Sequence, residues 1–112
     1  VMAPASNQEL IVTIIKKGYA EQVIEASRKA GAEGATIMFG RGTGIHEQKK
    51  LLGIPIEPEK EIIFTVVPAE ISEKVLAAII KAGKLERPAT GIAFVLELKM
   101  VVGVAHLLRE QA

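Results

Sequence analysis

The hydrophobic positions along this chain repeat as two similar units. Glu9–Gly31 aligns without a gap on Glu61–Gly83, at an offset of 52 positions (61 − 9). Nearly every apolar position of one segment is apolar in the other, and polar matches such as Thr13/Thr65 also recur. Self-similarity of this kind indicates two copies of one supersecondary unit.

Each unit predicts a strand, a helix and a second strand. A run of β-branched aliphatic residues opens the unit, and an amphipathic stretch with apolar residues at helical spacing follows. Gly31 and Gly83 come next, where the residue after a helix commonly takes a positive φ. With second strands at 35–39 and 92–104, the pattern predicts an α+β, ferredoxin-like βαββαβ fold. The helical stripes are Ala20, Val23, Ile24, Ser27 and Ala30, and Ile71, Val75, Leu76, Ile79 and Ala82.

The strands carry more apolar residues than one covered face requires. Two helices cover one face of a four-stranded sheet, and a strand with one wet face alternates apolar and polar residues. Leu10, Val12 and Ile14 are instead as apolar as Ile11 and Ile15. We therefore expect a partner to cover the second face of the sheet, and the first candidate is another copy of the chain. The alternative is that high β-propensity alone filled these positions.

Composition narrows the class of protein. At 112 residues and 49% hydrophobic, the chain suffices for one domain, predicted over 9–112 after a flexible leader at 1–8. The absence of cysteine excludes disulfides and cysteine-type zinc sites. A net charge of +1, with both signs mixed along the chain, predicts no nucleic-acid partner. The apolar runs are no longer than a strand and far shorter than a membrane span, and no export signal is recognisable. We therefore expect a soluble, cytoplasmic protein.

A glycine-rich strand end is the first candidate for binding chemistry. Gly40–Gly44 closes the predicted second strand with three glycines, and closely spaced glycines let backbone N–H groups approach an anion. Arg41 adds a charge, and Thr36 and Thr43 add hydroxyl donors. No helix opens after the last glycine, so this is not a Rossmann fingerprint. The alternative is a flexible hinge.

The long connection at 45–60 is the second candidate. It contains Gly53, Pro55 and Pro58, shows no strong periodicity, and mixes charged with apolar residues. Connections of this length are usually functional. The segment therefore predicts either a mobile loop that docks on another protein or an arm that packs on a neighbouring subunit.

The turn Gly83–Gly91 is the third candidate. Lys84, Arg87 and Thr90 could close on an anion, and the alternative is a solvated turn. No catalytic constellation accompanies these segments, because His46 and His106 are far apart and no acid–base pair stands out by spacing. The chain is therefore not predicted to be an enzyme or to hold a metal.

The order of these parts resembles the P-II family of signalling proteins. The resemblance covers about Glu9 to Val104 and implies a homotrimer that binds adenine nucleotides in clefts between subunits. It also implies that the 45–60 connection, called the T-loop in that family, carries the signal to a target such as a membrane transporter or an enzyme. The matching segments are Ala30–Thr36, Gly40–Gly44, Glu61–Pro68 and Gly83-Lys84 leading into Gly91–Val95.

The resemblance further implies positions for the ligand. Thr36 is expected near the adenine, Gly42 and Gly44 at the root of the T-loop beside the phosphates, and Gly83 and Lys84 in the turn called the B-loop. An adenine nucleotide, with no further cofactor, is thus expected where Gly40–Gly44 of one subunit faces Gly83–Gly91 of another. The candidate nucleotide-binding residues are Thr36, Gly40, Arg41, Gly42, Thr43, Gly44, Gly83, Lys84, Arg87, Thr90 and Gly91.

Departures from the family pattern change the expected ligand. The T-loop is short and has no tyrosine, which excludes uridylylation there. Small residues around Gly103 and Ala105 stand where the family holds a triphosphate with two arginines, and Glu86-Arg87-Pro88 replaces an expected glycine and lysine. ADP, AMP or a cyclic nucleotide is therefore expected rather than ATP with 2-oxoglutarate. Two other interpretations stay open, a trimeric metal-tolerance protein of the CutA type and an ACT-like small-molecule sensor.

Overall fold

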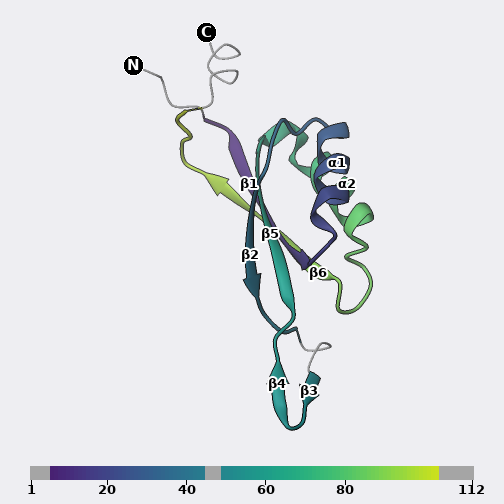
Figure 1. Ribbon diagram of the computed structural model, residues 1–112. Coiled ribbons are helices and arrows are strands. Elements are labelled where there is room, and N and C mark those ends of the chain that lie inside the picture. The colour runs from purple at the N-terminus through teal and green to yellow at the C-terminus, as the bar shows by residue number, and fades with distance from the viewer. Residues whose placement is uncertain (1–5, 45–48, 104–112) are drawn as a thin grey trace.

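The structure is a computed structural model that describes residues 6–44 and 49–103. In this part of the chain, the predicted βαββαβ order is present and a short hairpin is inserted into it (Figure 1). The ferredoxin-like fold is thereby confirmed. The elements are β1 (Gln8–Lys16), α1 (Ala20–Lys29), β2 (Thr36–Arg41), β3 (Lys49–Leu51), β4 (Ile54–Ile56), β5 (Glu59–Pro68), α2 (Ala69–Gly83) and β6 (Gly91–Leu98).

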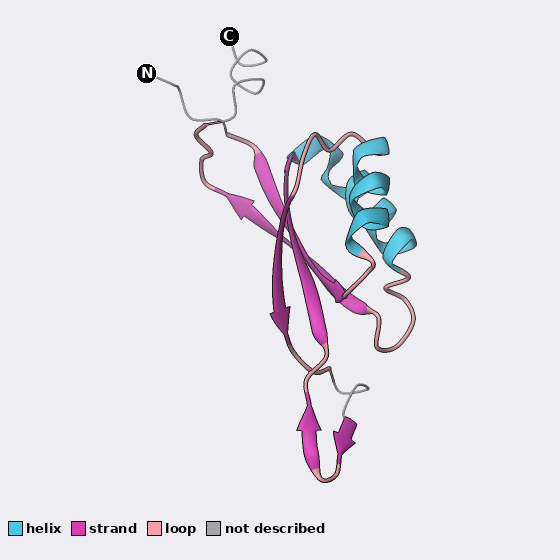
Figure 2. Ribbon diagram, viewed as in Figure 1, coloured by secondary structure: helices cyan, strands magenta, loops and turns pink. Residues whose placement is uncertain are grey.

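The long strands form one antiparallel sheet in the order β2-β5-β1-β6. The first strands of the two repeats are central neighbours, because β1 and β5 pair from Gln8↔Pro68 to Lys16↔Lys60. Both helices lie on the same face of this sheet (Figure 2). The β3–β4 hairpin projects from the end of the sheet where β2 stops and β5 starts (Figure 1).

The core fills the space between the helices and this covered face. Ile11 and Ile15 of β1 and Ile63 of β5 point into it and are fully buried. The helices contribute residues of the two apolar stripes predicted from the sequence. Apolar residues that recur about every 3.6 positions lie on one side of a helix, and in both helices that side faces the sheet. The fully buried helix residues are Ala20, Val23 and Ser27 of α1 and Val75 and Ile79 of α2.

The opposite face of the sheet, called the open face below, has no helix on it. Its side chains are apolar as predicted, and Phe94 and Leu96 remain 43% and 44% exposed. An apolar surface across a whole sheet marks an interaction site. The open face consists of Leu10, Val12 and Ile14 of β1, Thr36, Met38 and Gly40 of β2, Ile62, Phe64 and Val66 of β5, and Ile92, Phe94 and Leu96 of β6.

The end of α2 differs from the prediction. Gly31 has a positive φ of 117° as expected, but Gly83 is still the last residue of α2 and Lys84 takes the left-handed conformation, at φ 54°. A Cβ at Gly83 would lie 2.7 Å from Cδ1 of Ile15. This glycine is therefore required by the close packing of α2 on β1 and not by its backbone conformation.

Several strand boundaries differ from the predicted ones, because the pairing of neighbouring strands determines where a strand begins and ends. β2 spans Thr36–Arg41 rather than 35–39. β6 ends at Leu98 rather than 104, because its partner β1 begins at Gln8 and the last pair is Gln8↔Leu98. Gln8 is 6% exposed, so it belongs to the domain and not to the leader. The rest of the predicted leader at 1–5 and the predicted strand residue 104 lie outside the described residues.

The connection at 45–60 is shorter and more regular than predicted. β5 begins at Glu59, and β3 and β4 form a hairpin closed by Leu52 and Gly53, at φ 52° and 81°. Two consecutive residues with positive φ make the tight turn whose twist suits a β-hairpin. The sequence pattern did not predict it because a leucine precedes the glycine, where asparagine or aspartate is usual. Residues 45–48 lie outside the described residues.

Candidate functional site

A cavity of about 520 Å³ lies on the open face beside the carboxyl end of β2. Its floor is apolar, and its rim comes from the glycine-rich end of β2 on one side and the turn before β6 on the other. We call it the cationic cavity for the charges described below. It is lined by Ile14, Gly40, Arg41, Gly42, Thr43, Gly44, Lys60, Ile62, Arg87, Pro88, Ala89, Gly91 and Ile92.

Three cationic side chains line this cavity, and none of its described lining residues is acidic. Arg41 and Arg87 were predicted as site residues, whereas Lys60 was assigned to the long connection. Lys60 is only 6% exposed, because it lies in β5 opposite Lys16 and Gly40. A buried lysine with two arginines creates a positive potential that suits an anionic ligand.

The glycine-rich end of β2 provides space rather than an unusual backbone conformation. Neither Gly40 nor Gly42 has a positive φ, so neither takes the left-handed conformation that glycine favours. The N–H of Gly42 donates to the carbonyl of Pro58 at 3.1 Å. A Cβ at Gly42 would meet no atom within 4 Å, so the absent side chain leaves open space in the cavity wall.

The turn before β6 is held by its own hydrogen bonds. The Thr90 hydroxyl lies 2.8 Å from the carbonyl oxygen of Lys84 and 2.9 Å from that of Arg87, and can donate to either. Gly91 has no room for a Cβ, which would collide with the backbone of Ile14. Thr90 and Gly91 therefore shape the turn, and Arg87 is the charged residue that it presents to the cavity.

The structure separates some of the predicted site residues from this cavity. Gly83 packs in the core against Ile15, as described above. Lys84 lines a neighbouring hollow with Lys81 and Arg87 and not the cationic cavity. Gly40–Gly44 and residues 87–91, which were expected to face each other from different subunits, line one cavity within a single chain.

The reason is topological. β2 and β6 run in opposite directions, so the carboxyl end of β2 and the amino end of β6 lie at the same end of the sheet, with β5 and β1 between them. Gly40–Gly44 and Arg87–Gly91 of a single chain therefore line one cavity.

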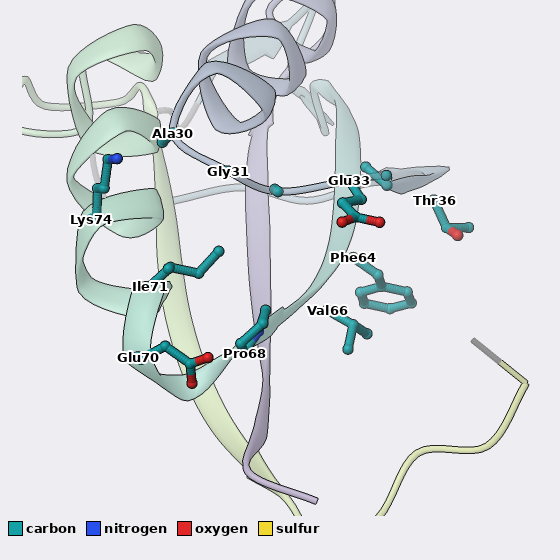
Figure 3. A pocket seen from close by; sticks show the side chains of 13 residues that line it. Ala30, Gly31, Glu33, Thr36, Phe64, Val66, Pro68, Glu70, Ile71 and Lys74 are labelled. Carbon is teal, nitrogen blue, oxygen red and sulfur yellow. The ribbon is translucent and has the colours of Figure 1, made fainter. Parts of the chain in front are cut away.

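Thr36 lies at the other end of β2, in a second pocket of about 660 Å³ (Figure 3). Five residue steps of a strand place it about 17 Å from Arg41. We call this the α1–β2 pocket. It is lined by Ala30, Gly31, Ala32, Glu33, Gly34, Ala35, Thr36, Phe64, Val66, Pro68, Glu70, Ile71 and Lys74.

The α1–β2 pocket differs in chemistry from the cationic cavity. Its charged lining residues are Glu33, Glu70 and Lys74, and Phe64 is its aromatic residue. Apart from Thr36, sequence analysis predicted none of these lining side chains as site residues. The repeat alignment held the relevant signal, since it places Phe64 on the same strand face as Val12 and thus away from the core.

An ion pair fixes the base of the hairpin to the β1–α1 turn. Lys17 Nζ lies 2.7 Å from Glu59 Oε2, and the Lys17 N–H donates to the Glu59 carbonyl at 3.3 Å. The hydrogen bond from Lys17 lowers the pKa of Glu59, and the same bond raises the pKa of Lys17. Both groups are therefore charged at neutral pH, although the exposed pair adds little stability.

Comparison with known proteins identifies the family. A sequence model described as "Nitrogen regulatory protein P-II" matches residues 8–106. The chain belongs to the P-II family. It is therefore a signalling protein of the P-II type, which sets aside the CutA-type and ACT-like interpretations. No curated protein matches the chain.

The same architecture occurs in a solved P-II structure. The chain is similar to a structure described as "Crystal Structure of Arabidopsis thaliana PII bound to citrate", with a TM-score of 0.67 and 24% identity. The similarity covers 84% of this chain and 79% of the Arabidopsis chain. At this identity the likeness shows a shared fold.

The described residues also bear on metals and membranes. No group of three or more histidine, aspartate or glutamate side chains among them could hold a metal ion. Neither helix in the described ranges has the length and apolarity to cross a membrane.

Proposed function

We propose that this P-II protein is a non-enzymatic regulator that binds an adenine nucleotide between the subunits of a homotrimer. The observation that carries the proposal is the cationic cavity, in which Arg41, Lys60 and Arg87 surround an open space beside Gly42. Three cationic side chains in a cavity whose described lining contains no acidic residue fit a phosphate group, and each charge-assisted bond contributes about 1.5–3 kcal/mol.

The distance between the two pockets supports a site shared by subunits. Thr36, expected near the adenine, is about 17 Å from Arg41 in the same chain. A mononucleotide is too short to reach both ends of β2. The two contacts are compatible with one ligand when the α1–β2 pocket of one subunit faces the cationic cavity of its neighbour. The apolar open face supplies the surface for such an assembly.

We propose ADP, AMP or a cyclic nucleotide as the ligand rather than ATP with 2-oxoglutarate. The reason is the set of small residues near Gly103, where the resemblance implies arginines for a triphosphate. The bound state would be relayed by the β3–β4 hairpin to a partner such as a membrane transporter or an enzyme. Leu52 and Ile54 near its tip are 94% and 67% exposed, which suits docking on an apolar surface.

Calorimetric titration with AMP, ADP, ATP and cyclic AMP tests the proposal. Wild type should bind at least one of them, and Gly42→Val should abolish binding because its side chain fills the open cavity. Lys60→Met keeps the length and removes the charge, so it should weaken binding at least about tenfold. Lys29→Met, an exposed lysine on α1, is the matched control and should bind as wild type.

Light scattering on the same samples should give the mass of three chains. The proposal fails if wild type binds none of the four nucleotides, or if Gly42→Val and Lys60→Met bind them as tightly as wild type. A stable monomer at micromolar concentration would refute the assembly.

A further inference from the structure

We propose that the β3–β4 hairpin docks on the surface of an anionic lipid bilayer and inserts Leu52 and Ile54 into it. The inference rests on the proposed function, in which this hairpin is the docking element, and it names the surface that the hairpin recognises. The partner in this inference is the lipid itself and not a membrane protein.

The tip of the hairpin is apolar and exposed. Leu52 is 94% exposed and Ile54 67%, and Leu52 has the largest exposed fraction of the large hydrophobic residues in the described ranges. Figure 1 shows the hairpin projecting away from the sheet and from both helices. The seven residue steps (59 − 52) from Leu52 to Glu59, the first residue of β5, can span up to about 23 Å. The tip can therefore reach a surface that the rest of the domain does not touch.

The backbone of Leu52 indicates that its side chain has a use at this position. Leu52 takes φ 52° in the two-residue turn between Leu51 and Ile54. Asparagine, aspartate and glycine adopt this left-handed conformation at lower cost, and they are the usual residues of such turns. A strained residue that its turn does not require is a signal of function. Because the Leu52 side chain is exposed and stabilises no core, that function lies in contact with a partner.

The composition of the hairpin suits a lipid surface better than a protein surface. Residues 51–56, Leu-Leu-Gly-Ile-Pro-Ile, include no side chain that can donate or accept a hydrogen bond. Protein interfaces obtain most of their binding energy from a few residues, often tryptophan, tyrosine or arginine, and leucine is under-represented among them. A bilayer requires only apolar area that enters the boundary between headgroups and acyl chains.

The charge of the hairpin specifies the type of lipid. Its sequence begins with Lys49 and Lys50, and no acidic residue follows before Glu57. Basic residues next to an apolar insertion attract anionic headgroups. One apolar anchor binds a membrane only weakly, and stable attachment needs a second signal. Here the second signal is the pair of lysines, and each subunit of the proposed trimer adds a further hairpin.

Pelleting of the full chain with lipid vesicles tests the inference. Wild type should pellet with vesicles that contain phosphatidylcholine and phosphatidylglycerol, and it should remain in the supernatant with phosphatidylcholine alone. Added salt should reduce the pelleted fraction, because salt screens the attraction between the lysines and the headgroups.

Leu52→Asn is the most specific variant, since asparagine suits the left-handed turn and removes the apolar side chain. It should weaken vesicle binding at least about tenfold, the fold-change that corresponds to burial of a leucine side chain. Leu52→Phe keeps an apolar tip and should bind within about threefold of wild type. Met100→Asn is the matched control and should bind as wild type, because Met100 is 56% exposed but follows β6 at the other end of the sheet.

Nucleotide titration of the same proteins separates this inference from the proposed function. Leu52 lines neither the cationic cavity nor the α1–β2 pocket, so Leu52→Asn should bind nucleotide as wild type does. A wild type that binds vesicles but no nucleotide would refute the proposed ligand and leave this inference standing.

Four results would overturn the inference. If wild type stays in the supernatant with anionic vesicles, the hairpin does not recognise lipid. If it pellets equally with neutral vesicles, anionic headgroups are not what it recognises. If Leu52→Asn pellets as wild type does, the hairpin is not the inserting element. If Met100→Asn reduces pelleting as much as Leu52→Asn, the adhesion is a non-specific effect of exposed apolar residues.

Discussion

At the scale of single residues, glycine has two distinct uses in this chain. Gly31 allows the positive φ that ends α1, whereas Gly83 allows α2 to pack closely on β1. The repeat alignment superposes these two glycines and so predicted the same use for both. The sequence could not distinguish them, because close approach between helix and strand depends on tertiary packing.

Gly83→Ala should lower the free energy of unfolding by about 1–3 kcal/mol, because overpacking a core costs this much. The new Cβ would lie 2.7 Å from Ile15 and 3.4 Å from Val23. Gly34→Ala is the matched control, since its Cβ would meet no atom within 4 Å, and its change should stay within about 0.5 kcal/mol. Urea denaturation measures both. A Gly83→Ala protein as stable as wild type would refute the packing argument.

At the residue scale, the sequence indicated the glycines and arginines that line the cationic cavity, but it did not indicate the pocket-lining residues Lys60 and Phe64. Arg41 and the adjacent glycines stand out in the sequence as a cluster. Lys60 and Phe64 belong to a strand in which every second residue points to the open face, and only the register shows which pocket each one reaches.

At the scale of elements, α1 is capped by a residue distant in the sequence. Tyr19 occupies the N-cap position and gives no side-chain cap. Instead, Glu61 Oε1 on β5 accepts hydrogen bonds from the N–H groups of Gly18 at 2.6 Å and Ala20 at 3.1 Å. This carboxylate satisfies backbone donors at the helix start and complements the positive end of the helix dipole.

Glu61→Ala should therefore destabilise the protein by about 1–2 kcal/mol, in the range for loss of a helix cap. Amide exchange should accelerate first at the start of α1. Glu25→Ala removes an exposed carboxylate on α1 that lies 3.8 Å from Lys29, and it should cost less than about 0.5 kcal/mol. Equal destabilisation by the two variants would show that Glu61 is not a specific cap.

The elements that the sequence predicted best are those present twice. The strand–helix units share a periodicity that is visible in each copy, so their order followed from the pattern alone. The β3–β4 hairpin has strands of three residues, too short to show a period, and its turn uses Leu52 at a position with φ 52°. Short strands with an atypical turn residue leave no recognisable sequence signal.

At the scale of the whole molecule, the two pockets lie at opposite ends of β2, and the apolar open face extends between them. Under the proposed function, this arrangement makes a single chain incomplete as a nucleotide site. The sequence predicted the apolar second face and a site shared between subunits, with Gly40–Gly44 and Gly83–Gly91 contributed by different subunits. Strand direction in the folded sheet places the end of β2 and the start of β6 at the same end of the sheet, so that Gly40–Gly44 and residues 87–91 of one chain line one cavity.

Mixed trimers test the shared site most directly. Gly42→Val blocks the cationic cavity, and Thr36→Arg places a bulky cation in the α1–β2 pocket, so each variant alone should not bind nucleotide. In co-expressed mixed trimers, a site is intact where the α1–β2 pocket of a Gly42→Val subunit faces the cationic cavity of a Thr36→Arg subunit. Random assembly of equal amounts should restore binding at about one quarter of the sites. Calorimetry that finds no restored sites in verified mixed trimers would contradict a site shared between subunits.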